Sequence, residues 1–215
     1  ELAAATGAII SYGSLAKADF AIEPLADGQT LSLGEVTLEI RHTPGHTPES
    51  ISIVVRPQAA SAPWAVLTGD TLFIGDVGRP DLLASVGVSA SELGASLYTS
   101  VNRLMGLPDT TFVLPAHGAG SACGKALSTE TISTIGAQRR TNYALQPMPE
   151  DRFVDLVTEG QPTAPGYFGY DASLNRQDRA LLDEHELPAR LDLAAVDAAV
   201  ADGAVLLDTR PGDDF

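Results

Sequence analysis

The chain has 215 residues, of which 44% are hydrophobic and 19% charged, a balance typical of a folded globular protein rather than a disordered one. Its formal net charge of -15 disfavours a nucleic-acid partner, because binding to phosphate backbones depends on clustered lysine and arginine. No apolar run reaches membrane-spanning length and the first 13 residues contain no basic segment, so we expect a cytoplasmic protein without membrane contact.

Short strands separated by turns are predicted along the first third of the chain. Residues 2–6 indicate the last turns of a helix that Gly7 caps. Apolar and polar side chains alternate over 36–40, which is typical of a half-buried strand, whereas the β-branched residues over 51–55 favour a core strand. The predicted strands are residues 8–12, 30–33, 36–40, 51–55 and 64–68.

The rest of the chain predicts helices, one further strand and a linker. Ser89 and Glu92 form a capping box for a helix with apolar residues at helical spacing. A strand is expected over 112–114, and a second helix is expected to begin at Ser128 and to bury Ile132 and Ile135. Prolines and polar clusters indicate a linker before a last helix, and the final predicted elements are the linker 148–188, the helix 193–201 and the strand 205–210.

Three of the predicted strands are each followed by a side chain that can bind a metal ion. His46 lies in the turn that begins at Thr43, and the prolines of that turn stiffen its backbone. Asp70 follows the strand 64–68, and His117 follows the strand 112–114. Histidine and aspartate supply the nitrogen and oxygen ligands expected for iron, zinc or manganese. Each motif alone is also a common turn, but together they predict a metal site.

Other segments contain residues for which the sequence allows more than one role. Arg79 and Asp81 either form an ion pair that orders their loop or shape the wall of the site. Arg139 also suits the end of a helix, where a cation interacts favourably with the helix dipole. The single cysteine, Cys123, fits a reducing compartment, and because no base neighbours it in sequence we assign no catalytic cysteine.

Several motifs together resemble the metallo-β-lactamase superfamily over about residues 1–145. They are Thr43–Thr47, Thr68–Phe73 and Leu114–Gly118. Within that superfamily, Gly78–Asp81 and Arg139–Leu145 resemble the persulfide dioxygenase branch, specifically its bacterial members fused to rhodanese-like domains. Leu206–Phe215 resembles the opening strand and loop of a rhodanese-like domain.

This resemblance implies an α/β fold, the αββα sandwich of the metallo-β-lactamase type, followed by a linker and the start of an α/β rhodanese-like domain. The expected divisions are 1–147, 148–188 and 189–215. The His-x-His-x-Asp-His segment that supplies the family's first metal ligands does not occur in this sequence. We therefore expect the first domain to lack its N-terminal part and the chain on its own to be inactive.

The resemblance also implies a function. It implies a non-haem Fe(II) dioxygenase that oxidises glutathione persulfide, or another small thiol conjugate, to sulfite in sulfane-sulfur metabolism. His46 and Asp70 would bind the iron, and His117 would assist the site or bind a second metal. The residues expected to bind the substrate are Arg79, Asp81, Arg139 and Asn142.

Two alternatives are kept. The chain also resembles glyoxalase II, a thioester hydrolase in which Asp70 would bridge two metal ions, with zinc in place of iron, and His117 would bind the second ion. The absence of the first ligand segment favours a non-catalytic fragment or adaptor instead. The identity of the metal and the oligomeric state, including a homo-oligomer, are left open.

Overall fold

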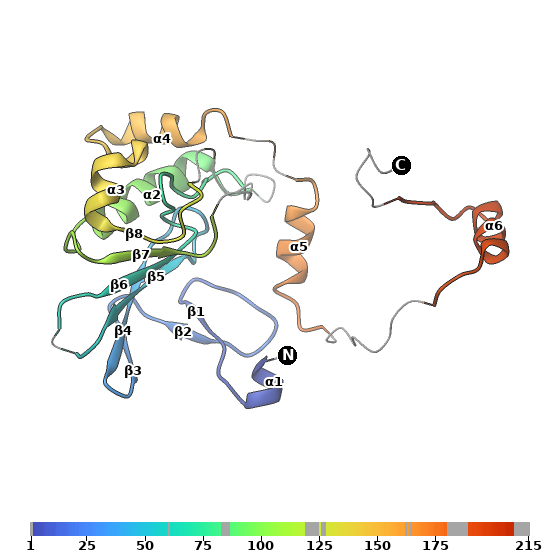
Figure 1. Cartoon of the computed structure of the whole chain (residues 1–215), viewed down its shortest axis with the longest axis horizontal. Coiled ribbons are helices and arrows are strands. Elements are labelled where there is room, and N and C mark those ends of the chain that lie inside the picture. The colour runs from blue at the N-terminus through green and yellow to red at the C-terminus, as the bar shows by residue number, and fades with distance from the viewer. Residues whose placement is uncertain are drawn as a thin grey trace. The chain divides into compact units, whose positions relative to one another are not determined.

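The computed structural model of the chain describes residues 2–59, 61–82, 87–118, 125, 128–161, 163, 165–179 and 189–208. The chain divides into two units, Glu1–Asp178 and Arg179–Phe215. The first unit contains a mixed sheet, the helices that pack on it and all of the predicted metal ligands (Figure 1).

The sheet has six strands in the order β3-β4-β5-β6-β7-β8. Adjacent strands of this sheet are antiparallel, with one exception. The strands β6 and β7 are parallel, because the helix α2 (Ala90–Leu104) connects them. Five of these six strands were expected from the sequence within a few residues, and β8 was not. The strands are β3 (Thr30–Leu33), β4 (Val36–His42), β5 (Ile51–Arg56), β6 (Ala65–Gly69), β7 (Phe112–Pro115) and β8 (Ser133–Thr134).

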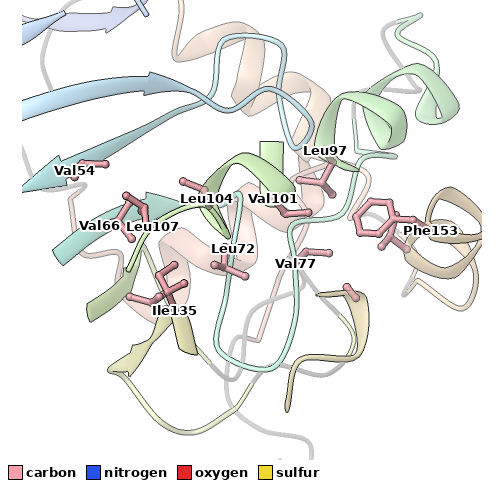
Figure 2. Packing of buried hydrophobic residues seen from close by; sticks show 13 residues of the cluster. Val54, Val66, Leu72, Val77, Leu97, Val101, Leu104, Leu107, Ile135 and Phe153 are labelled. Atoms are coloured by element: carbon pink, nitrogen blue, oxygen red, sulfur yellow. The ribbon is translucent and has the colours of Figure 1, made fainter. Parts of the chain in front are cut away.

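Helices cover one face of this sheet and bury its apolar side chains. Figure 1 shows α2, α3 (Ile135–Thr141) and α4 (Glu150–Thr158) on the same side of the strands. As expected, the side chain of Ser89 caps α2 by accepting a hydrogen bond from the amide of Glu92. Figure 2 shows the resulting core cluster, which includes strand residues such as Val54 and Val66 together with Leu97 and Val101 of α2. The sequence-based expectation of an α/β fold is confirmed.

The structure corrects the N-terminal part of the predicted linker 148–188. Residues 150–158 form α4, and its Phe153 and Val157 are fully buried in the core cluster. The ring of Phe153 also packs edge-to-face on Tyr98 of α2, with 5.3 Å between the ring centroids. The prolines before and after α4 are typical of a linker, so the sequence did not predict this packed helix. The short helix η2 (Tyr143–Leu145) connects α3 with α4.

The beginning of the first unit forms a small separate layer. It contains α1 (Leu2–Thr6) and a two-stranded parallel sheet of β1 (Ser11–Gly13) and β2 (Glu23–Leu25). The helix α5 (Phe168–Leu174) lies within the same unit, and the chain just after it is tied to the β1–β2 loop by a hydrogen bond from the amide of Asp19 to the carbonyl of Arg176, 2.7 Å long. The loop and the end of α5 are therefore neighbours.

Two secondary-structure predictions need correction. The helix expected from Ser128 begins at Ile135 instead, because Ser133 and Thr134 pair with β7 and leave Ile132 exposed. In the second unit, α6 (Leu193–Ala201) matches the expected helix, but residues 205–208 form no strand. A strand needs a hydrogen-bonded neighbour, and Val205 to Leu207 are exposed. Residues 209–215 lie outside the described residues, and the rhodanese-like domain stays a prediction.

Candidate metal centre

His46 lies in the turn between β4 and β5, and this turn is fixed from two sides. The hydroxyl of Ser100 on α2 donates a hydrogen bond of 2.7 Å to the carbonyl of Pro44. Thr43, which is fully buried, shares a hydrogen bond of 2.9 Å with Ser52 of β5. The Thr71 hydroxyl is 3.0 Å from that of Thr43, so the turn is linked directly to the loop that follows Asp70.

Asp70 lies between the two predicted histidine ligands. Its Oδ2 is 3.3 Å from Nε2 of His46, and its Oδ1 is 3.5 Å from Nε2 of His117. The structure therefore brings together three side chains that are 24 and 47 residues apart in sequence. They form two adjacent pairs and not a full ligand set, since the described part of the chain holds no group of three His, Cys, Asp or Glu side chains arranged to bind a metal ion.

The other nitrogen of His46 has a partner of its own. Nδ1 lies 3.0 Å from the carbonyl oxygen of Arg79. A carbonyl can only accept a hydrogen bond, so Nδ1 carries a proton, and in the neutral ring Nε2, on the side of Asp70, is then the nitrogen with the free lone pair. This is the arrangement in which metal-binding histidines are usually held.

The loop that supplies this carbonyl is anchored by a buried ion pair. The Arg79 side chain is only 1% exposed, and it donates hydrogen bonds of 2.7 and 2.6 Å to the two carboxylate oxygens of Asp81. Burial raises the pKa of Asp81, but the hydrogen bonds and charge of Arg79 outweigh burial, and the pKa is lowered overall. Gly78 lies so close to the Asp70 carbonyl and to Cβ of His46 that no side chain fits there.

A second buried network holds the same loop from the other side. Asp76 is fully buried, and its carboxylate accepts hydrogen bonds of 2.7 Å from the Tyr143 hydroxyl and 2.7 Å from the Lys125 amide. Burial and the bond to Asp76 raise the pKa of Tyr143. Sequence patterns did not indicate this network, because its members are about 50 and 67 residues from Asp76 and share no local motif.

His117 is the least satisfied of the three candidate ligands. Its ring packs on Phe73 with 4.6 Å between the ring centroids. Both ring nitrogens are buried without a hydrogen-bond partner, although Asp70 lies nearby. A buried imidazole nitrogen without a partner is costly, and a metal ion or bound water at Nε2 would satisfy it. The three side chains therefore offer donor atoms that suit a metal ion, without forming a full ligand set.

The residues expected to bind substrate all have partners within the protein, and their role in substrate binding stays a prediction. Asn142 is fully buried, and its side chain bonds to Asp76, Gln138 and Ala144 within the protein. Arg139 pairs with Asp109 and donates to the carbonyl of Met105. Arg79 and Asp81 bond to each other as described above. These groups order the fold, and Cys123 lies outside the described residues.

Comparisons with known proteins agree with this fold. No family model matches the chain. An uncharacterized protein from Mycobacterium leprae is 41% identical over 121 residues, which is 56% of this chain and 45% of that protein. A probable metallo-hydrolase from Burkholderia pseudomallei is 32% identical over 65% of this chain and 46% of its own length. The mitochondrial persulfide dioxygenase ETHE1 of Bos taurus is 31% identical over 64% of this chain and 45% of its own length.

Two solved structures resemble the chain closely. A metallo-β-lactamase from Staphylococcus aureus superposes with a TM-score of 0.76 at 31% identity, covering 85% of this chain and 54% of that one. ETHE1 from Myxococcus xanthus superposes with a TM-score of 0.64 at 25% identity, covering 81% of this chain and 68% of that one. The chain spans about half the length of the curated relatives it matches. The chain is therefore similar, in fold and in sequence, to proteins of the metallo-β-lactamase superfamily.

Proposed function

We propose that the native polypeptide carrying this chain is an iron-dependent dioxygenase that oxidises a small persulfide, with glutathione persulfide as the substrate, to sulfite. The observation that carries the proposal is the His46–Asp70 pair, 3.3 Å apart, in which Nδ1 of His46 is already occupied by the Arg79 carbonyl. The proposal is supported by the similarity of the chain to the persulfide dioxygenase ETHE1 of Bos taurus over 64% of its length.

The donor set suits ferrous iron. One histidine and one carboxylate are two of the three ligands of the non-haem iron site built from two histidines and a carboxylate, which leaves positions open for substrate and dioxygen. When bound, the iron would supply the redox chemistry that joins dioxygen to the terminal sulfur. Overall, one persulfide, one dioxygen and one water give one thiol, one sulfite and two protons. The terminal sulfur is oxidised and dioxygen is reduced.

The protein's own residues have distinct tasks in this proposal. His46 and Asp70 would bind the iron, and the Arg79 carbonyl would orient the His46 ring so that Nε2 is the nitrogen that faces it. His117 lies beside the second oxygen of Asp70 and would not itself bind this iron. Phe73, packed on the His117 ring, shields that side of the site from water.

A metallo-hydrolase is the second candidate, and one observation favours it. The two oxygens of Asp70 face different histidines, which is an arrangement that can bridge two metal ions. Two relatives named as probable metallo-hydrolases are also similar to this chain. In that case His117 would bind the second ion, and the substrate would be a thioester.

Parallel assays on the anaerobically purified native polypeptide distinguish the two candidates. The proposal predicts dioxygen uptake and sulfite formation with glutathione persulfide, and no release of thiol from S-lactoylglutathione. Asp70→Asn should abolish the uptake, whereas Asp197→Asn, an exposed carboxylate on α6, should leave it unchanged. Thioester hydrolysis without dioxygen uptake would overturn the proposal in favour of the hydrolase.

A further inference from the structure

A pocket of about 210 Å³ lies beside the turn that carries His46. Its walls come from β1 and the loop after it, from the chain directly after His46, and from the end of α5. Gly13 of β1 lies against the carbonyl of Glu49 so closely that a side chain would collide, so this wall rests directly on the His46 turn. The residues used below are Tyr12, Lys17, Phe20, Thr47, Glu49 and Arg176.

Two cations face this pocket without partners of their own. Neither Lys17 nor Arg176 makes an ion pair or a side-chain hydrogen bond with another described residue. Of the other described arginines in the same unit, Arg140 and Arg152 also form no ion pair, whereas five each pair with a carboxylate: Arg41, Arg56, Arg79, Arg103 and Arg139. In a chain with a net charge of -15, two unpaired cations at one pocket mark it as a site for a negatively charged group.

The backbone keeps the two cations near each other. The amide of Asp19 donates a hydrogen bond of 2.7 Å to the carbonyl of Arg176, and Asp19 is two residues from Lys17. Lys17 and Arg176 are thus held at one place although they come from opposite ends of the unit. A carboxylate between them would form charge-assisted hydrogen bonds with both.

The other residues that line the pocket restrict which chemical groups the ligand can have. Glu49 supplies one carboxylate, which can bind an ammonium group, and Tyr12 and Phe20 supply aromatic surfaces for methylene groups. The volume lies below the range of about 300–1,000 Å³ that is typical of whole-ligand sites, so the pocket suits part of a substrate. A carboxylate, an ammonium and a short apolar stem are the features of an amino acid.

We infer that this pocket binds the zwitterionic amino-acid end of a peptidic thiol substrate, with Lys17 and Arg176 on its carboxylate and Glu49 on its ammonium group. This inference rests on the proposed function for the identity of the sulfur-bearing end. Thr47 lines the pocket and directly follows His46, so a bound thiol would extend from the pocket toward the His46–Asp70 pair.

The test is calorimetric binding of S-methylglutathione to the metal-free native polypeptide, because this probe cannot react. Loss of one charge-assisted contact weakens binding by about tenfold. Lys17→Glu and Arg176→Glu also place a negative charge against the carboxylate, so they should weaken binding by more than about tenfold. The milder Arg176→Met should weaken binding in the same direction and guards against misfolding. Arg140→Glu is the matched control, since Arg140 is exposed on α3 away from the pocket lining, and it should bind the probe like the wild type.

Glu49 is tested with a second probe. N-acetyl-S-methylglutathione lacks the ammonium group, so it should bind the wild type weakly, and Glu49→Gln should reduce the difference between the two probes. Wild-type binding by the Lys17 and Arg176 variants, or no binding of S-methylglutathione to the wild type, overturns the inference. If the probe binds through Lys17 and Arg176 but the protein does not oxidise glutathione persulfide, only the proposed function is refuted. If the protein oxidises the persulfide and the Lys17 and Arg176 variants oxidise it equally well, only this binding site is refuted.

Discussion

Nδ1 of His46 lies 3.0 Å from the carbonyl oxygen of Arg79, and the Arg79 side chain is buried in a two-point ion pair with Asp81. A candidate metal ligand is thereby oriented by a backbone atom whose position depends on a salt bridge. The bridge contributes to the site through geometry, because the guanidinium, at 1% exposure, has no access to a substrate.

Replacing Gly78 with alanine should disturb this geometry. A Cβ at this position collides with the Asp70 carbonyl and lies 3.1 Å from Cβ of His46, so both candidate ligands must shift. We expect metal affinity to fall by about ten- to hundredfold, as for other changes that misorient ligands. Competition with a chelator measures the affinity, and the ¹⁵N shifts of His46 report its tautomer.

Gly166→Ala is the control for that experiment, because an added Cβ there meets no atom within 4 Å. It should change neither the metal affinity nor the ¹⁵N shifts of His46. Unchanged metal affinity in Gly78→Ala would show that the loop does not position the ligands.

Substitution of the three candidate ligands should give unequal results. His46→Ala and Asp70→Asn should abolish metal retention in the native polypeptide, because both groups face the same point. His117→Ala should leave one iron largely bound, since its Nε2 contacts only the far oxygen of Asp70. Elemental analysis gives the stoichiometry, and equal metal loss in all three variants would support a binuclear hydrolase.

The helix α4 provides a test of where the first domain ends. Phe153→Ala removes a fully buried ring, which should lower the free energy of unfolding by about 3–5 kcal/mol. Asp155→Ala on the exposed face of the same helix should change it by less than about 0.5 kcal/mol. Urea denaturation measures both, and a Phe153→Ala variant as stable as the control would mean that α4 is linker after all.

Acid should weaken the link between the β2–β3 turn and α2. The hydrogen bonds from Arg103 lower the pKa of Asp27 below its ordinary value of 3.8. A carboxyl whose folded pKa is lowered stabilises the protein fully above its ordinary value, and this contribution is lost as the pH falls through the folded pKa. The stability difference between wild type and Asp27→Asn should therefore shrink as the pH falls below about 4. Urea denaturation from neutral to acidic pH measures it, and a constant difference would contradict the assignment.

Patterns along the sequence predicted most of the sheet, because burial of one face requires alternation of apolar and polar residues. They located β4, β5 and β7 within a few residues, and they placed His46, Asp70 and His117 at strand ends, where the structure brings them together. Their role as metal ligands stays a prediction.

Sequence reasoning failed where position depends on partners distant along the chain. Ser133 and Thr134 precede a good helix, but pairing with β7 makes them a strand. The contact to His46 comes from the backbone carbonyl of Arg79, which every residue type has, so the sequence does not mark it. The Thr43–Ser52 hydrogen bond joins two hydroxyl groups of common residue types, which no pattern singles out. Asn142 was assigned to the substrate by resemblance, whereas its burial was visible only once the neighbouring elements had been placed.

The most direct test of the proposed function is dioxygen uptake by the iron-loaded native polypeptide with glutathione persulfide. The proposal predicts one dioxygen consumed and one sulfite formed per persulfide, with both lost in Asp70→Asn. Full turnover of a glutathione thioester with no dioxygen uptake would contradict it.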